Sequence, residues 1–198
     1  LSGEWNSCFK TCEFGNAANL PKKPRSPGQS RRPSPQISIM NNLPFTTDEL
    51  YEFIDKAGKA TYAGGASDLP NPERPDFHEL EYKEGDFYYR DSYTGQTRAR
   101  GMEVVRFEGK PVWTCAYGGG MAKGKDELDS HCYEFLKKSL SAEEAGFKSF
   151  RGPHNFTYGD WKYEYTQDGD IEEFNGYEEI YYKDELVFFH RAIGGTII

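Results

Sequence analysis

Two glutamates stand at matching places in the chain and have the setting for acid–base chemistry. Each ends a short motif, Gly101-x-Glu103 and Gly176-x-Glu178, inside a segment rich in aromatic residues, and Glu81 and Asp91 lie in similar surroundings. A carboxyl group withdrawn from water has a raised pKa and can exchange a proton near neutral pH. Paired carboxylates of this kind serve hydrolases. The alternative is that each glutamate accepts backbone hydrogen bonds where two parts of the fold join.

Two arginines precede rigid turns, in Arg74-Pro75 and Arg151-Gly152-Pro153. A guanidinium held by such a turn can bind a carboxylate or phosphate through two hydrogen bonds. It can equally anchor its own loop to an internal carboxylate. We therefore predict that Glu103 and Glu178 are at least half buried and bonded to backbone amides or to one of these arginines.

The histidines and cysteines lack the spacing of a metal site or a disulfide framework, and we predict neither. His78 alternates with Leu80 in a strand-like segment and is a third candidate for catalysis, after Glu103 and Glu178. Cys115 and His190 occupy matching positions, so a nucleophilic Cys–His dyad is one interpretation. Two buried strand residues are the other.

Aromatic residues are numerous, with 14 Tyr, 14 Phe and 3 Trp in 198 residues. Tyrosines inside a curved sheet can line a cavity for a planar or apolar ligand, or they can fill a core with their hydroxyl groups reaching water. The predicted ligand-binding residues combine these aromatics with the two arginines: Tyr62, Arg74, Tyr82, Tyr89, Trp113, Tyr117, Arg151 and Tyr177. None of the glycine pairs has the spacing of a phosphate-binding loop or a dinucleotide fingerprint, so no cofactor is predicted.

A repeat positions these residues. Gly85-Asp86-Phe87-Tyr88-Tyr89 matches Gly159-Asp160-Trp161-Lys162-Tyr163, and the two glutamate motifs match after one inserted residue. The repeat spans about 84–121 and 158–198 and is rich in β-branched and aromatic residues, which is typical of strands. Within the second copy, 156–165 and 171–174 are each predicted to be one strand. We expect Glu103 and Glu178 to face each other about a pseudo-twofold axis.

Two amphipathic helices accompany the strands. Thr46-x-x-Glu49 is a capping box, and apolar residues follow it at helical spacing up to Ala60. A second apolar stripe runs from Leu128 to Leu140. The predicted fold class is α+β, with two similar antiparallel β-meanders forming one curved sheet or incomplete barrel and two main helices packed against it.

The first 40 residues differ from the rest. They carry six Lys and Arg against two Glu, whereas residues 41–198 carry a net charge of −12. We predict a disordered basic leader at 1–40, not necessarily native, and a single domain at 41–198. No apolar run reaches the roughly 18–20 residues of a membrane span, and a total charge of −8 makes nucleic acid an unlikely partner of the folded domain. We expect a cytoplasmic protein.

Several short motifs occur together in order, among them Thr61-Tyr62-Ala63-Gly64-Gly65, Pro111-Val112-Trp113, Arg151-Gly152-Pro153 and Gly194-Gly195. With these motifs, the chain resembles a bacterial and archaeal family of domains of unknown function, DUF5680. The resemblance covers about residues 45–198. Members often follow a repressor-type helix-turn-helix, which the leader here cannot form. The resemblance implies an architecture but no chemistry.

The sequence leaves three functions open. The first is a domain that binds or senses a small molecule, which the resemblance to helix-turn-helix fusions implies. The second is a small hydrolase that uses Glu103 or Glu178 with His78 or Arg151. The third is a protein–protein adaptor that uses the acidic surface and an exposed sheet edge. Whether the protein is an enzyme, and in which oligomeric state it acts, stays undecided at this level.

Overall fold

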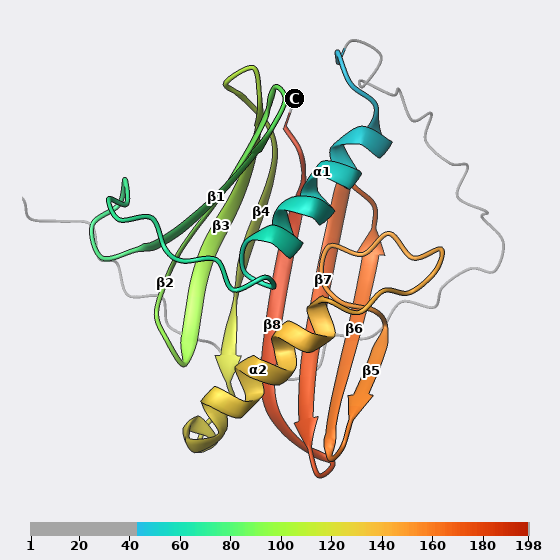
Figure 1. Cartoon of the computed structure of the whole chain (residues 1–198). Helices are drawn as coiled ribbons and strands as arrows, with labels where there is room; N and C mark the ends of the chain where they lie inside the picture. The colour runs from blue at the N-terminus through green and yellow to red at the C-terminus, as the bar shows by residue number, and fades with distance from the viewer. Residues whose placement is uncertain (1–42, 198) are drawn as a thin grey trace, which may run out of the picture. The chain divides into compact units, whose positions relative to one another are not determined.

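One open antiparallel sheet of eight strands forms the frame of the molecule (Figure 1). The structure is a computed structural model that describes residues 43–197, so the predicted leader lies outside the described residues. The strands are β1 (His78–Glu84), β2 (Phe87–Thr94), β3 (Arg98–Phe107), β4 (Lys110–Met121), β5 (Asn155–Tyr158), β6 (Trp161–Gly169), β7 (Glu173–Tyr182) and β8 (Glu185–Thr196). Their order in the sheet is β1-β2-β3-β4-β8-β7-β6-β5. The predicted α+β class is confirmed, and the sheet does not close.

The strand order is that of two meanders joined edge to edge, β1–β4 and β5–β8, with β4 paired to β8 at the centre. Equivalent details recur in both. The register shifts at Val105/Arg106 between β3 and β4, and again at Ile180/Tyr181 between β7 and β8. A helix precedes each meander, so the repeated unit is one helix followed by four strands. It is therefore longer than the segments that the sequence matches.

Helix α1 (Thr47–Ala60) begins at the predicted capping box, in which Thr46 and Glu49 bond reciprocally. Its buried face consists of Leu50, Phe53, Ile54 and Ala57. The structure therefore has the helix and the apolar face that the spacing predicts.

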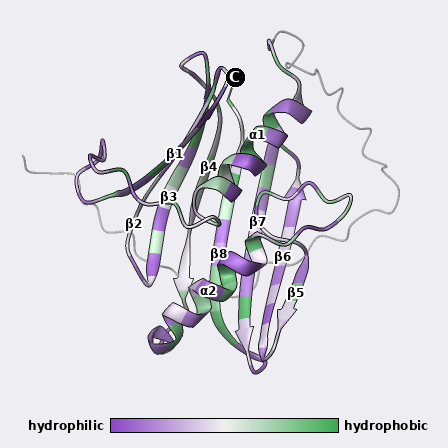
Figure 2. Cartoon of the chain, viewed as in Figure 1, coloured by the Kyte–Doolittle hydropathy of each residue, from purple (hydrophilic) through white to green (hydrophobic). Residues whose placement is uncertain are grey.

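Helix α2 (Asp129–Leu140) follows a short 3-10 turn, η2 (Asp126–Leu128). Cys132, Phe135 and Leu136 are buried on its inner side, and Lys137 and Lys138 lie in its last turn, where cations complement the helix dipole. Both helices pack on the same face of the sheet (Figure 1). Figure 2 shows polar residues on their outer sides.

Two of the predicted strand limits are wrong. The segment 156–165 is two strands, β5 and β6, because a turn at Gly159 with positive φ divides them. The segment 171–174 is no strand of its own: only its last two residues are extended, and they begin β7. Aromatic content indicates extended backbone but does not show where it turns.

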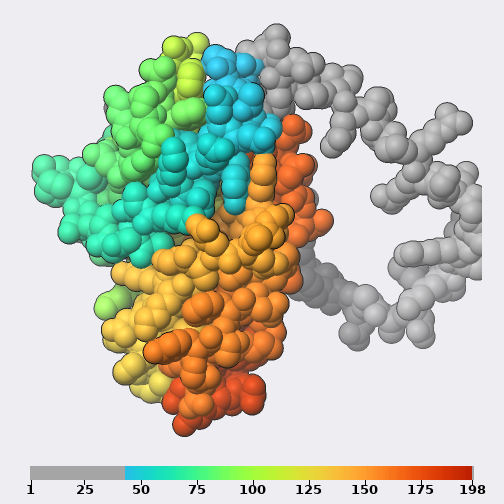
Figure 3. All heavy atoms as spheres, turned by 45° about the vertical axis from the view of Figure 1, so that its right-hand side comes forward, coloured from blue at the N-terminus to red at the C-terminus, as the bar shows by residue number. Residues whose placement is uncertain are grey.

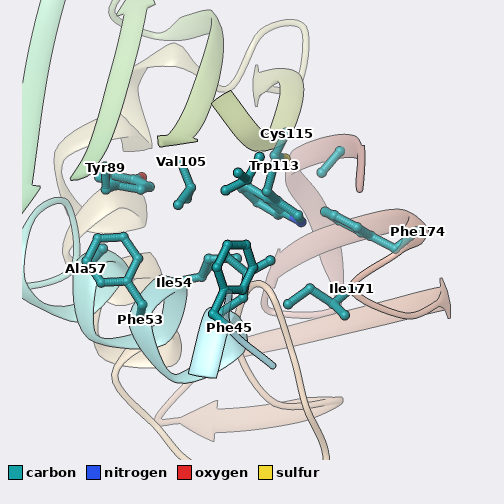
Figure 4. Close-up of a cluster of buried hydrophobic side chains, with 13 residues drawn as sticks. Phe45, Phe53, Ile54, Ala57, Tyr89, Val105, Trp113, Cys115, Ile171 and Phe174 are labelled. Carbon is teal, nitrogen blue, oxygen red and sulfur yellow. The ribbon is translucent and has the colours of Figure 1, made fainter. Parts of the chain in front are cut away.

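The core has two parts, one under each helix. Figure 4 shows the first, where Phe53 and Ile54 of α1 meet Tyr89, Val105 and Trp113 of the sheet. The second lies under α2 and includes Phe135, Leu136, Tyr163, Ile180 and Phe188. Because each helix has its own core cluster, the region between them is free to hold a cavity.

Candidate functional site

A cavity of about 610 Å³ lies between the two helices and the inner face of the sheet. Its walls come from α1, α2, strands β1, β2, β3, β4 and β8, and the segment before β5. In Figure 3, α1 (cyan) and the residues from 120 onward (yellow to orange) adjoin on the side of the molecule that covers the sheet. The aromatic residues that line the cavity are Tyr62, Tyr89, Tyr93, Tyr117, Tyr133, Phe150 and Phe188.

Two carboxyl groups lie side by side in this cavity. Asp91 of β2 is paired directly with Glu103 of β3, so their side chains leave the same face of neighbouring strands. Directly paired residues have Cβ atoms about 4.5–5.5 Å apart. The Tyr117 hydroxyl donates to Asp91 Oδ1 over 2.6 Å. It reaches Asp91 by passing over Gly101, where a Cβ would lie only 2.4 Å from that hydroxyl oxygen.

The surroundings of the two acids keep a proton on them. Burial raises the pKa of Asp91 to about 6, although the Tyr117 hydrogen bond and the Arg151 charge oppose the shift. Burial and then the charge of Asp91 raise the pKa of Glu103 to about 8, opposed by Arg151 and Tyr89. At pH 7 the pair therefore holds about one proton and one negative charge.

Glu178 has a different environment, although it is the repeat counterpart of Glu103. Arg151 donates from Nε to Glu178 Oε2 and from Nη2 to Oε1, both over 3.1 Å. The Tyr163 hydroxyl donates to Oε2 over 2.7 Å and accepts from the Gly152 amide. Burial alone would keep Glu178 protonated, but Arg151, His190 and Tyr163 outweigh it and lower its pKa. This ion pair closes one end of the cavity, of which Arg151 forms part of the wall.

The predicted partnership of the glutamates with arginine holds for Glu178 and not for Glu103. Among residues 43–197 no arginine or lysine forms a salt bridge with Glu103, and Arg74 instead stacks on Phe77. The two glutamates do not face each other either. Strands β4 and β8 lie between β3 and β7, which sets the two glutamate-bearing strands about 14 Å apart.

His190 is buried, with 7% of its surface exposed, and lines the cavity. Its nearest charged neighbour is Glu178, whose Oε1 is 4.0 Å from Nδ1, and no hydrogen bond joins its ring to any other described residue. Burial and the charge of Arg151 lower its pKa to about 4, so the imidazole is neutral at pH 7. It is a polar group turned toward the cavity without a protein partner.

The Cys–His dyad does not form. His190 is paired across the sheet with Gly119, four residues along β4 from Cys115. Burial also raises the pKa of the Cys115 thiol, which keeps it protonated and a poor nucleophile. Both residues occupy buried strand positions, as the alternative interpretation has it.

His78 lies at the edge of the cavity and forms a second polar group there. Its Nδ1 is 2.6 Å from Asp68 Oδ2, and its ring stacks on Tyr93 with 4.9 Å between centroids. The hydrogen bond that a histidine makes through one ring nitrogen determines which tautomer it adopts, so Asp68 orients the His78 ring. The His78 side chain is nearly half exposed.

The structure brings together six of the residues singled out from the sequence and leaves five elsewhere. Those that line the cavity are Tyr62, His78, Tyr89, Glu103, Tyr117 and Arg151. Those outside it are Arg74, Tyr82, Trp113, Tyr177 and Glu178.

The residues outside the cavity have structural contacts. Tyr82 packs on Phe53 of α1, and Trp113 is fully buried and stacks on Phe174. Tyr177 is in contact with Arg191, its cross-strand partner on β8. Since cavity-facing His190 directly precedes Arg191, that pair lies on the opposite face of the sheet.

Sequence reasoning missed Tyr93 and Tyr133, considered His190 only as the partner of Cys115, and did not select Asp91 as a site residue. A signal for Asp91 was present, because pairing the two strands around the turn at Gly95 sets Asp91 opposite Glu103. The place of His190 in the cavity had no such signal, since it depends on the pairing of β4 with β8, which is distant in sequence.

The described residues contain no cluster of three or more His, Cys, Asp or Glu side chains that could hold a metal ion. Within residues 43–197 no helix combines the length and the apolar character needed to cross a bilayer.

The fold and cavity define an α+β domain built from two helix-plus-meander units, with a cavity between its helices and its sheet. Residues 91–197 match the sequence profile of the family described as "Domain of unknown function (DUF5680)", and the chain belongs to that family. The match begins at Asp91 and includes Glu103, Arg151, Glu178 and His190. Neither a curated protein nor a solved structure matches the chain.

Proposed function

We propose that this domain binds a small organic molecule in the cavity between α1, α2 and the sheet. The observation that carries the proposal is the cavity itself, whose volume of about 610 Å³ lies within the usual range of ligand sites. Its walls combine tyrosine rings with a few polar groups, Asp91, Glu103 and His190, that have unused hydrogen-bonding capacity. Aromatic walls supply apolar contact area, and isolated polar groups select a ligand's orientation.

A screen of metabolites by thermal shift tests the proposal, because a molecule that binds the native state raises its melting temperature. Gly58 of α1 lines the cavity, and a Cβ there meets no atom within 4 Å. Gly58→Phe should fill part of the cavity and abolish the shift, whereas Gly58→Ala is the matched control and should retain it. If no compound shifts the parent, or if every shift survives in Gly58→Phe, this cavity is not a binding site.

A second function has one observation in its favour, namely the adjacent acids Asp91 and Glu103. Their raised pKa values suit proton transfer near neutral pH, and the Asp68–His78 pair supplies a further proton acceptor at the cavity edge. A small hydrolase of this kind would turn over a compound that the screen identifies. Product formation by the parent, lost in Glu103→Gln while binding persists, would favour the enzyme; binding without product favours the binding domain.

A further inference from the structure

The two halves of the sheet contain the same glutamate in two electrostatic settings. Tyr89 in the first half corresponds to Tyr163 in the second, so each glutamate has a tyrosine on the neighbouring strand. The second half adds a cation, Arg151, which satisfies both oxygens of Glu178. The first half adds a second acid instead, since Asp91 takes the place that Tyr165 has in the other half. The first half therefore lacks a positive charge where the second half has one.

Two further features point to a ligand at the same place. His190 has only 7% of its surface exposed and is turned toward the cavity, yet no protein group bonds its ring. Asp91, only 4% exposed, also lines the cavity, and no salt bridge joins it to a basic side chain among residues 43–197. Among the described residues, Asp91 has the Tyr117 hydrogen bond but no cation beside it, and the His190 ring has no hydrogen bond. Because buried polar groups nearly always have their bonding capacity filled, both groups mark where a molecule in the cavity would bind.

The tyrosines around the acids suit a positive charge. Tyr89 and Tyr117 flank the pair, and Tyr93 lies on the same face of β2. Aromatic faces attract ammonium and guanidinium groups, with the strongest effect where water is excluded. Three tyrosines beside two carboxylates therefore favour a cation with an apolar body over a neutral or anionic molecule.

We propose that the ligand carries a positively charged nitrogen, an ammonium or amidinium group, which binds between Asp91 and Glu103 as the Arg151 guanidinium binds Glu178 in the other half. The inference rests on the proposed ligand-binding function and adds the chemical class of the ligand. The neutral imidazole of His190 offers an acceptor for a further N–H of the ligand.

Binding should release a proton, since a cation favours the ionised form of both acids. Burial and mutual repulsion hold one proton on the pair at pH 7, and the ligand's charge would displace it. Affinity should therefore rise between about pH 6 and pH 8. The groups that act on the pair are Tyr89 of β2, Cys115 and Tyr117 of β4, and Arg151 before β5. The other titratable groups that line the cavity are Asp55 and Lys59 of α1, Tyr62, His78 of β1, Tyr93 of β2, Asp129, Tyr133 and Lys137 of α2, and His190 of β8.

Of the groups nearest the acids, the two tyrosines, Cys115 and His190 keep their charge between pH 6 and pH 8. Burial raises the pKa of Tyr89, Tyr117 and Cys115 further above neutral, and His190 is already uncharged at pH 6. Loss of the proton release in Asp91→Asn and Glu103→Gln would identify the acids, rather than His78, as its source.

The experiment compares matched triplets of compounds, each an amine, an alcohol and a carboxylic acid on one aromatic or alkyl body, with phenethylamine, phenethyl alcohol and hydrocinnamate as one such set. Titration calorimetry on the full chain gives affinity, and its repetition in buffers of different ionisation enthalpy gives the protons released. The variants are Asp91→Asn and Glu103→Gln. The control is Glu81→Gln, a carboxylate on the opposite face of the same β1–β2 hairpin.

We expect amines to bind more tightly than their alcohols and acids, with a proton released near pH 7. Asp91→Asn and Glu103→Gln should weaken amine binding by about tenfold to a hundredfold, as loss of a charged hydrogen bond does, and Glu81→Gln should not. The inference fails if alcohols or acids bind equally well, or if the two variants bind amines as the parent does. In that outcome, compounds that bind the parent but not Gly58→Phe would still support the proposal that the cavity binds a ligand. If no member of the triplets binds and the metabolite screen also finds nothing, the proposed function fails with it.

Discussion

The Arg151 guanidinium forms a bidentate ion pair with the Glu178 carboxylate, in which Nε and Nη2 each lie 3.1 Å from one of its two oxygens. Arg151 belongs to the segment between α2 and β5, whereas Glu178 lies in the middle of β7. The ion pair therefore fixes that segment over the sheet and, with it, one wall of the cavity. Glu178 is 1% exposed, so neither charge can be exchanged for water without cost.

Glu178→Ala should lower the free energy of unfolding by about 3–5 kcal/mol, because it leaves a buried guanidinium without its partner. Chemical denaturation at neutral pH measures the change. Glu173→Ala, an exposed residue of the same strand, is the control and should have little effect. Equal losses in the two variants would contradict a structural role for the pair.

Glu103→Gln should instead raise the free energy of unfolding at high pH. Because the pKa of Glu103 is about 8 in the folded protein against an ordinary value of 4.5, the folded state binds its proton more tightly. The resulting stability is complete below about pH 4.5 and is lost as the pH rises to about 8. A glutamine does not ionise, so above pH 8 the variant should be more stable than the parent by about 1–2 kcal/mol, less than the full shift implies because the side chain lines a solvent-accessible cavity.

Denaturation curves at pH 4 and above pH 8 separate this electrostatic effect from any change in packing. The two proteins should be close in stability at pH 4 and differ at high pH. A Glu103→Gln variant that loses stability relative to the parent as the pH rises would show that Glu103 is ionised and bonded in the fold, as Glu178 is. An equal deficit at both pH values would be a change in packing.

Tyr117→Phe should raise the pKa of Asp91 above about 6. The hydroxyl donates a hydrogen bond to Asp91 Oδ1, which favours the ionised carboxylate, and its removal leaves burial less opposed. Carboxyl carbon shifts in a pH titration by NMR report the midpoint. Tyr177→Phe, whose hydroxyl bonds Glu179, is the control. A midpoint for Asp91 that falls or stays constant would refute the assignment.

Gly119→Ala should destabilise the contact between the two halves. A Cβ at this position would lie 2.1 Å from the Phe189 carbonyl oxygen of β8, so β4 and β8 would have to separate. We expect a loss of about 2 kcal/mol or more, as for other overpacked sites. Gly58→Ala, which meets no atom, should instead gain about 0.5–1 kcal/mol through helix propensity. Thermal unfolding should therefore show a lower melting temperature for Gly119→Ala and a higher one for Gly58→Ala.

Local pattern was enough for much of the fold. The capping box at Thr46 and the apolar spacing after it define α1, and the matched glycine and aromatic residues define the two meanders. The ends of the strands were harder to predict. Residues 156–165 all favour extended backbone, and the turn that divides them into a hairpin depends on the positive φ of Gly159.

The site was only half accessible from sequence, because the repeat made unlike residues look alike. Glu103 and Glu178 share a motif, and nothing local shows that one has an arginine partner and the other an aspartate beside it. Trp113 and Tyr82 are aromatic like Tyr89 and Tyr117, yet they fill the core rather than the cavity. Which side chain faces a cavity depends on how far each helix lies from the sheet, and that is set by packing over the whole domain.

The pairing of β4 with β8 has a consequence for how such a site can arise. A chain containing only one helix and four strands would leave β4 as a bare edge, and two copies would associate through it with identical halves. Each copy would then need both the acid pair and the arginine at the same positions. Joining the halves in one polypeptide replaces a concentration-dependent encounter by an intramolecular contact. It also lets the two halves differ, which exact symmetry forbids: one half pairs its glutamate with an arginine, while the other has two acids without a basic partner among residues 43–197.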